Sequence, residues 1–549
     1  MTETKAVRPT VPKSIDVVIV GAGFGGMYML HRLRGLGMSA IVFETASGVG
    51  GTWYWNRYPG ARCDVESMQY SYSFSKDLEQ EWTWSELFAG QPEILRYANF
   101  VADKFDLRRD ICFETKVTEA RFDPTARRWA VRTDRGDEVS ARYCVMATGC
   151  LSTARVPDFS GLSDFKGKTY HTGYWPHEPV DFTGLRVGVI GTGSSAIQAI
   201  PVIAEQAANV TVFQRTPNFS IPSRNGPMTP QYERSWKDVY PARRAEARMS
   251  RNGVLANPND KPAIETPEPE RTAIYEQRWA SGGTTFMASF NDLIFSKASN
   301  DTAAHFVRSK IKSIVKDPVK AELLAPTNHP IGTKRICVDT NYYQTYNRPN
   351  VDLVDVRSQP IECLTSKGLR VGGREYEFDA IVFATGFDAM TGALTRINLI
   401  GREGQTLAEK WEAGPRTYLG LMTAGFPNLF MITGPGSPSV LSNMMVSIEQ
   451  HVDWITDCLA HLTGHQLDCI EPTSASEDAW VEHVNEVAHG TLYPSAASWY
   501  MGANIPGKPR VFMPYIGGVG AYRAKCAEIA ADGYRGFRLL GPSRAVAAE

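Results

Sequence analysis

The sequence predicts an α/β fold with two parallel β-sheets, because one strand–loop–helix motif occurs twice in its 549 residues. The first copy has the glycine-rich loop GAGFGG at residues 21–26, directly after the apolar run VVIV at 17–20. The second copy has GTGSSA at residues 191–196, after VGVI at 187–190. Such loops turn tightly and present the free N–H groups of a helix start to a pyrophosphate. Each motif therefore predicts a Rossmann-like dinucleotide-binding domain, and their repetition makes an ordinary turn the weaker interpretation.

The residue that ends the following strand distinguishes the two nucleotides. After the first loop that residue is Glu44, whose carboxylate can accept hydrogen bonds from a ribose diol. After the second loop the strand ends in QRT at residues 214–216, with no acid but with Arg215. A guanidinium at this place favours a ribose 2′-phosphate. The sequence therefore predicts FAD at the first loop and NADPH at the second, which makes the protein a redox enzyme.

Most cofactor contacts are expected from these loops and strand ends. The residues predicted to contact FAD are Gly21, Gly23, Phe24, Gly26 and Glu44. The residues predicted to contact NADPH are Gly191, Thr192, Gly193, Ser194, Ser195, Arg215 and Thr216.

The order of the motifs predicts two interleaved domains, with a helical insertion in the second. A strand at 143–146 closes the first unit, whereas a strand that ends on ATGF at 384–387 closes the second only much later. The predicted parts are the FAD-binding domain at 1–152 and 388–549, the NADPH-binding domain at 153–220 and 332–387, and the insertion at 221–331.

Helical periodicity marks the insertion and one further helix. Within the insertion the pattern predicts helices over 232–248, 268–280 and 302–315, and residues 299–301 (SND) are expected to cap the third. A helix over 443–462 follows a glycine- and proline-rich loop. If its N-terminus faces the flavin, it would stabilise negative charge on the reduced ring.

Composition excludes several classes of function. The formal net charge is −1, so nothing indicates attraction to nucleic acid or to an anionic membrane. The nine cysteines show neither CxxC pairs nor zinc spacing, which predicts buried thiols in a reducing compartment and no metal site. The N-terminal apolar run is too short for a membrane span and lacks the form of a signal peptide. We therefore expect a cytoplasmic enzyme.

Two longer motifs give a resemblance to a known family. Residues 165–176 (FKGKTYHTGYWP) fit the pattern FxGxxxHxxxW(P/D), and residues 50–64 read GGTWYWNRYPGARCD. Together they resemble the paired signatures of the type I Baeyer–Villiger monooxygenases, over nearly the whole chain. The loop SPSVLS at 437–442 is similar to that of the phenylacetone monooxygenase-like branch.

The resemblance implies an FAD- and NADPH-dependent enzyme that converts ketones and O2 into esters or lactones through a C4a-peroxyflavin. It makes Arg335 the cation that stabilises the reacting oxygen, with Asp64 as the residue that orients it. It also implies that Lys334 joins Arg215 at the 2′-phosphate, where Thr216 would add a hydroxyl donor.

The remaining candidates are also drawn from these motifs. Further cofactor contacts are expected from Thr52, Trp53, Trp55, Asp64, Tyr70, Arg335 and Met444. The substrate pocket is expected to include Tyr58, Ser439, Val440, Leu441 and Trp499. The resemblance implies that His171 takes part in an NADPH-linked conformational change, but a structural histidine at a domain junction is equally compatible with the motif.

Two other functions use the same pair of nucleotide folds. A flavin monooxygenase that oxidises amine or sulfide heteroatoms is the main alternative, and the Trp-Pro end of the long motif disfavours it. A disulfide or quinone reductase is disfavoured because the chain has no CxxC. The motifs specify neither the ketone nor the oligomeric state.

Overall fold

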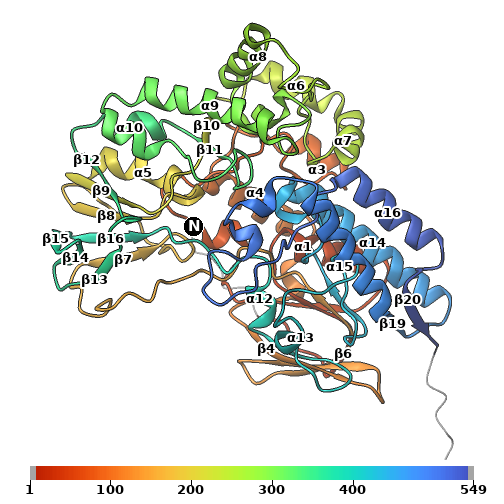
Figure 1. Ribbon diagram of the computed structural model, residues 1–549. Coiled ribbons are helices and arrows are strands. Elements are labelled where there is room, and N and C mark those ends of the chain that lie inside the picture. The colour runs from red at the N-terminus through yellow and green to blue at the C-terminus, as the bar shows by residue number, and fades with distance from the viewer. Residues whose placement is uncertain (1–7, 542–549) are drawn as a thin grey trace, which may run out of the picture.

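The computed structural model describes residues 8–541, which form two sheet-based units with helices packed around them (Figure 1). The first sheet has the strand order β17-β4-β5-β6-β1-β2-β3, and β18 pairs with β6. Its strands are β1 Ser14–Val20, β2 Ala40–Phe43, β3 Ile111–Cys112, β4 Val117–Asp123, β5 Arg128–Thr133, β6 Glu138–Met146, β17 Asn398–Ile400 and β18 Leu429–Met431.

The centre of the first sheet is parallel and buried. Strand β1 pairs in parallel with β2, where Val20 lies opposite Phe43, and with β6 on its other side. Val17, Val18 and Ile19 are fully buried, as expected for a parallel strand that is covered on both faces. Because β1 and β2 end at the same edge, the first glycine loop lies beside Glu44, which directly follows β2.

The second sheet is wholly parallel, with the order β12-β9-β8-β16-β7. Its strands are β7 Lys168–His171, β8 Arg186–Ile190, β9 Asn209–Gln214, β12 Val351–Asp355 and β16 Ala380–Phe383. Ile190 lies opposite Phe213 in the register of β8 and β9. The second glycine loop and Arg215, which follow these two strands, therefore meet at one sheet edge.

Each glycine loop leads into a helix, α1 (Phe24–Gly35) or α5 (Ser194–Gln206). Helix α1 approaches its loop so closely that a Cβ on Gly26 would lie 1.8 Å from the carbonyl oxygen of Gly21. On its other side α1 packs against α14 (Met444–Gly464). The predicted helix over 443–462 is thus present, with Asn443 as N-cap, whose side chain accepts a hydrogen bond from the Met445 N–H at 3.1 Å.

Five helices lie between the two parts of the second unit, at the upper side of Figure 1. They are α6 Pro230–Lys237, α7 Tyr240–Met249, α8 Glu268–Ser281, α9 Lys297–Ile314 and α10 Pro318–Leu324. The prediction of a single helix over 232–248 is wrong. The helix ends before Asp238 and Val239, and α7 begins after them with Pro241 in its first turn. Proline is tolerated there because N–H groups in the first turn have no partner within the helix.

The predicted cap over residues 299–301 is also wrong. Helix α9 starts earlier, and its N-cap is Ser296, whose hydroxyl accepts from the Ser299 N–H at 3.3 Å. Asn300 is instead fully buried inside the helix, where its amide donates to the carbonyls of Leu293 (2.7 Å) and Ile331 (2.8 Å). The polar residues that suggested a cap therefore hold the helix against its neighbours.

Helix α7 also attaches this region to the first unit. The guanidinium of Arg244 is almost fully buried and pairs with Glu79 at 3.0 Å, while it donates to the Ser71 hydroxyl at 2.6 Å. The five helices therefore contact both units.

The remaining elements are shorter or peripheral. The helices are α2 Thr52–Trp55, α3 Lys76–Glu81, α4 Gln91–Lys104, α11 Tyr342–Thr345, α12 Gly392–Thr395, α13 Leu407–Lys410, α15 Ser474–His489 and α16 Val519–Ala531. The strands are β10 Ser220–Pro222, β11 Cys337–Asp339, β13 Ile361–Leu364, β14 Gly368–Val371, β15 Arg374–Glu377, β19 Cys469–Pro472 and β20 Phe537–Leu540. The 3-10 segments are η1 Arg108–Asp110, η2 Gly283–Ser289, η3 Ser439–Leu441, η4 Tyr493–Ser495 and η5 Trp499–Met501.

All nine cysteines lie in the described residues and are free, so no disulfide links the elements. Over residues 8–541 no helix combines the length and the apolar character that a bilayer crossing needs.

Candidate active site

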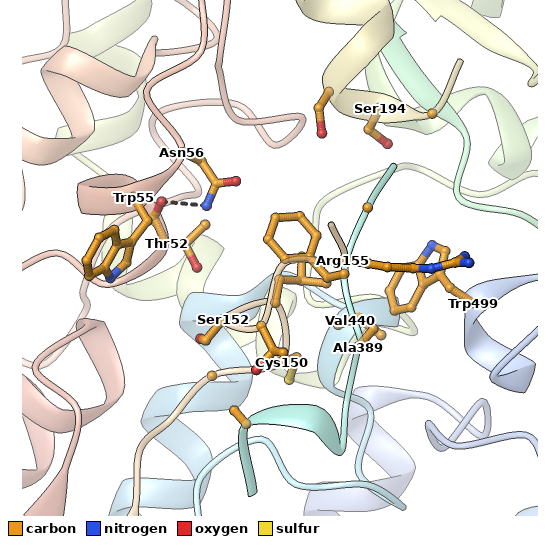
Figure 2. A pocket seen from close by; sticks show the side chains of 18 of the residues that line it. Thr52, Trp55, Asn56, Cys150, Ser152, Arg155, Ser194, Ala389, Val440 and Trp499 are labelled. Atoms are coloured by element: carbon orange, nitrogen blue, oxygen red, sulfur yellow. Dashed lines mark hydrogen bonds between the residues drawn. The ribbon is translucent and has the colours of Figure 1, made fainter. Parts of the chain in front are cut away.

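A cavity of about 1180 Å³ lies between the two units and contains both glycine loops in its wall. Figure 2 shows part of that wall, with Thr52 and Trp55 of α2 on one side and Ser194 of α5 on another. Trp499 of η5 closes it from a third direction. Residues that are far apart in the sequence therefore surround a single space.

The glycine loops fit two dinucleotides. Gly21 (φ +104°) and Gly191 (φ +114°) adopt a backbone conformation that favours glycine, and a Cβ would lie 2.6 Å and 2.5 Å from the carbonyl oxygens of Ala147 and Ala384. Gly23 and Gly193 are the N-caps of α1 and α5, and neither helix has a side-chain cap. The N–H groups of both helix starts are therefore available to a pyrophosphate.

The carboxylate of Glu44 is fixed in the wall of the first nucleotide site. It is 6% exposed and accepts hydrogen bonds from the N–H groups of Ala22 (2.6 Å) and Ala46 (2.7 Å). Each carboxylate oxygen has two lone pairs, so these contacts leave capacity for a ribose hydroxyl. Glu44 thus lies where the sequence predicts a ribose partner.

Positively charged side chains lie together at the second nucleotide site. Arg215 and Lys334 both line the cavity, and Thr216 lies beside them. Burial lowers the pKa of Lys334, and the positive charge of Arg215 lowers it further. Two cations that destabilise one another in this way would both be stabilised by a doubly charged phosphate.

A third cation, Arg155, was not identified from the sequence. It lines the same cavity, and its pKa is lowered by burial and by the charge of Arg215. Its guanidinium donates to the carbonyl of Asn504, and Figure 2 shows it extending toward the side of Trp499. Arg155 lies in a connecting segment outside the motifs, so no local pattern marked it.

Arg335 and Asp64 form an ion pair across the two units. The Nε of Arg335 donates to Oδ2 of Asp64 at 3.2 Å, and its Nη1 donates to the carbonyl of Val440 at 3.3 Å. Asp64 is 7% exposed, whereas the Arg335 side chain is 36% exposed and lines the cavity. Burial works against the charge of Arg335, but the carboxylate of Asp64 raises the pKa of Arg335 above its usual value. The guanidinium therefore stays charged.

Aromatic and apolar side chains complete the wall near the first loop. The indole Nε1 of Trp53 donates to the Tyr70 hydroxyl at 3.0 Å, and both residues line the cavity. The other predicted cofactor contacts in the wall are Phe24, Thr52, Trp55, Met444, Thr192, Ser194 and Ser195. Of the predicted substrate residues, Tyr58, Val440 and Trp499 line the cavity.

Three predicted site residues lie behind the wall rather than in it. Gly26 serves the close contact between α1 and its loop, as described above. Ser439 is fully buried, with its hydroxyl 3.1 Å from the thiol of Cys150, and Leu441 packs in an apolar cluster with Val440. Of the three residues in this 3-10 turn, only Val440 lines the cavity.

His171 also lies away from the cavity wall. Its Nε2 is 3.0 Å from the carbonyl oxygen of Arg155 and 3.1 Å from the hydroxyl of Thr385, and its Nδ1 accepts from the Gly173 N–H at 3.0 Å. Burial lowers the pKa of His171. The imidazole of His171 is therefore neutral, and both of its ring nitrogens have hydrogen-bond partners. It connects the segments that contain Arg155 and Thr385.

The chain is similar to known oxidoreductases over most of its length. Residues 18–268 match the family described as pyridine nucleotide-disulphide oxidoreductase. The chain is 42% identical to a Baeyer-Villiger monooxygenase of Pseudooceanicola batsensis over 96% of both chains. It is 41% identical to the phenazine N-monooxygenase PhzNO1 of Lysobacter antibioticus, over 97% of this chain and 98% of that protein.

Solved structures match over the same length. The structure of an oxidized steroid monooxygenase bound to NADP superposes with a TM-score of 0.93 at 54% identity, and covers 96% of this chain and 100% of its own. Similar structures include complexes with both FAD and NADP.

We expect the two glycine loops to hold different nucleotides. Alanine at 23 or 193 meets no protein atom closer than 3.4 Å, so its methyl group crowds the pyrophosphate and not the fold. Gly23→Ala should give protein poor in FAD, whereas Gly193→Ala should stay yellow and be reduced slowly by NADPH. Gly35→Ala, at the far end of α1 with open space around it, is the control for both. Flavin absorbance and stopped-flow reduction measure these outcomes, and the reverse pattern would contradict the assignment.

Arg215 should determine the preference for NADPH over NADH. Loss of a charge-assisted phosphate contact costs about 1.5–3 kcal/mol, or roughly a 10- to 150-fold rise in KM. Arg215→Ala should therefore raise the KM for NADPH by that factor and leave the KM for NADH nearly unchanged. Arg370→Ala, at an exposed position of β14, serves as the control. Steady-state kinetics with both nucleotides decide the matter, and a wild-type protein that uses NADH equally well would refute the idea.

Proposed function

This chain belongs to the Baeyer–Villiger monooxygenases, and we propose that it uses O2 to convert a ketone into an ester or lactone. It is an FAD- and NADPH-dependent oxidoreductase. When bound, the reduced flavin supplies the activation of O2. Its free thiols support a reducing compartment, from which we infer the cytoplasm.

The observation that carries the proposal is the pairing of Arg335 with the buried Asp64 in a cavity shared by both nucleotide loops. Insertion of oxygen beside a carbonyl places negative charge on oxygen, and a fixed cation stabilises that charge most when water is excluded. Arg335 meets this need because its pKa is raised and it does not give up its proton. Asp64 holds the plane of the guanidinium in one orientation.

The other residues of the wall have supporting roles in this proposal. Arg215 and Lys334 would hold the 2′-phosphate of NADPH, while the start of α5 binds its pyrophosphate. Helix α14 begins at the cavity with Met444, so the positive end of its dipole is directed at the flavin site. Tyr58, Val440 and Trp499 would contact the ketone.

Oxidation of a nitrogen or sulfur atom is the second candidate, because one relative of similar identity is named as an N-monooxygenase. The two reactions differ in product and not in cofactor demand. Purified, FAD-loaded protein should consume NADPH with members of a ketone panel and release esters or lactones, identified by gas chromatography. N-oxides or sulfoxides from an amine and sulfide panel, without any ester from ketones, would favour the second candidate.

Arg335 should be needed for oxygen insertion more than for FAD binding. Removal of one preorganised donor to a developing oxyanion costs about 3–4 kcal/mol, or roughly 100- to 1000-fold in rate. Arg335→Ala should keep its flavin and its reduction by NADPH but lose ester formation by at least that factor. Arg335→Lys should recover little, because an ammonium does not reproduce the planar fork that Asp64 holds. Ester formation by Arg335→Ala at nearly the wild-type rate would refute this role.

A further inference from the structure

Gln198 is a buried polar residue in the apolar middle of its helix. Its helix, α5, has the sequence SSAIQAIPVIAEQ, and the side chains around Gln198 belong to the core of the second unit. Gln198 itself is 8% exposed and lines the cavity between the units. A buried amide is costly unless all of its hydrogen bonds are made, so its partners indicate why it is there.

All four hydrogen-bonding positions of the amide are used, and every partner lies in the first unit. Oε1 accepts from the Tyr58 hydroxyl at 2.9 Å and from the Arg62 N–H at 3.3 Å. Nε2 donates to the Arg62 carbonyl at 3.1 Å and to Oδ1 of Asp64 at 3.3 Å. Because Arg62 offers both an N–H and a carbonyl, the amide can satisfy all partners in only one orientation.

The backbone of α5 also contacts this loop directly. Gly60 has φ +82°, and a Cβ at this position would lie 2.3 Å from the carbonyl oxygen of Gln198. The loop over 58–64 and helix α5 are therefore in close contact, with no room for a side chain at position 60. A movement of α5 relative to the loop must strain the contacts of Gln198.

These contacts connect Gln198 to the ion pair. One carboxylate oxygen of Asp64 binds Arg335, and the other binds Gln198. A neutral amide donor stabilises the ionised carboxylate without replacing Arg335 as its counter-charge. The other titratable groups that interact with Asp64 or Arg335 are Tyr58, Cys63, Tyr70, Cys337, Tyr493 and Tyr500, and burial raises the pKa of each, so all of them are neutral at pH 7.

We propose that Gln198 is a positioning residue that holds Asp64, and through it Arg335, in register with the helix that binds the second nucleotide. Helix α5 begins at Ser194, directly after its N-cap Gly193, and carries Gln198 about one turn later on the same element. Docking of NADPH at the start of α5 is thereby linked to the orientation of the cation. This inference rests on the proposed function, in which Arg335 stabilises the reacting oxygen.

The first test removes the amide but keeps its size. Gln198→Met should retain FAD and be reduced by NADPH within a few-fold of the wild-type rate. The fraction of consumed NADPH that appears as ester should fall about tenfold or more at every pH, with the rest released as hydrogen peroxide. Gln206→Met, at the exposed end of the same helix, is the matched control and should behave as wild type. An unchanged ester yield in Gln198→Met would overturn the proposal.

The second test uses charge and needs no ketone. In Gln198→Glu a carboxyl group faces Oδ1 of Asp64, and two adjacent buried carboxyls do not both ionise readily, so the pKa of the new group is raised. While protonated it can still donate, but as pH rises past that pKa it ionises and repels Asp64. The flavin absorbance of the holoenzyme should therefore acquire a pH transition that wild type and Gln206→Glu lack.

The two readouts separate this proposal from the function on which it rests. If wild type makes no ester but Gln198→Glu shows the transition, the proposed function fails and the link to the ion pair stands. If wild type makes ester but Gln198→Glu shows neither the transition nor a loss of ester yield toward high pH, the positioning role is wrong.

Discussion

The interaction on which the site depends is one ion pair between the two units. Asp64 belongs to a loop of the first unit and is buried, whereas Arg335 belongs to the return of the chain into the second unit and lines the cavity. A buried carboxylate is costly without a counter-charge, so Asp64 is stabilised only when both units are docked and Arg335 lies beside it. Parallel strands make this possible because their carboxyl ends, and the loops that follow, converge on one edge of each sheet.

The groups around the pair leave its two opposite charges in balance. The remaining hydrogen-bond partners of the pair are neutral: the Gln198 amide on Asp64 and the Val440 carbonyl on Arg335. Further cations, Arg155, Arg215 and Lys334, line the same cavity, and burial together with the charge of Arg215 lowers the pKa of both Arg155 and Lys334. The cavity therefore contains one cation that a carboxylate neutralises, Arg335, and a group of cations that Asp64 does not neutralise. Only this group requires a phosphate as its counter-charge.

Local motifs predicted much of this arrangement. The glycine loops, Glu44, Arg215 and the helix after Asn443 could be located because their function depends on backbone geometry that short sequences encode. The break at Val239 was missed because the helical pattern continues across it, although Pro241 starts a new helix there. The cap at Ser296 was missed because polar residues such as Asn300, which make tertiary contacts, resemble a cap signal. Ser439 and Leu441 were assigned by proximity in sequence, which does not determine which side of a 3-10 turn faces the cavity.

Gln198 and Arg155 were missed for a more general reason. Their partners are more than 130 and 340 residues away in the chain, so no local pattern contains the information. For Gln198 one signal did exist, since an amide in the middle of the apolar part of a helix requires partners outside that helix. That requirement predicts that such a contact exists but does not identify the partner residues. The contact joins α5, the helix at the second nucleotide loop, to Asp64 of the first unit. A coupling between flavin reduction by NADPH and oxygen insertion would have to pass between these two parts of the site.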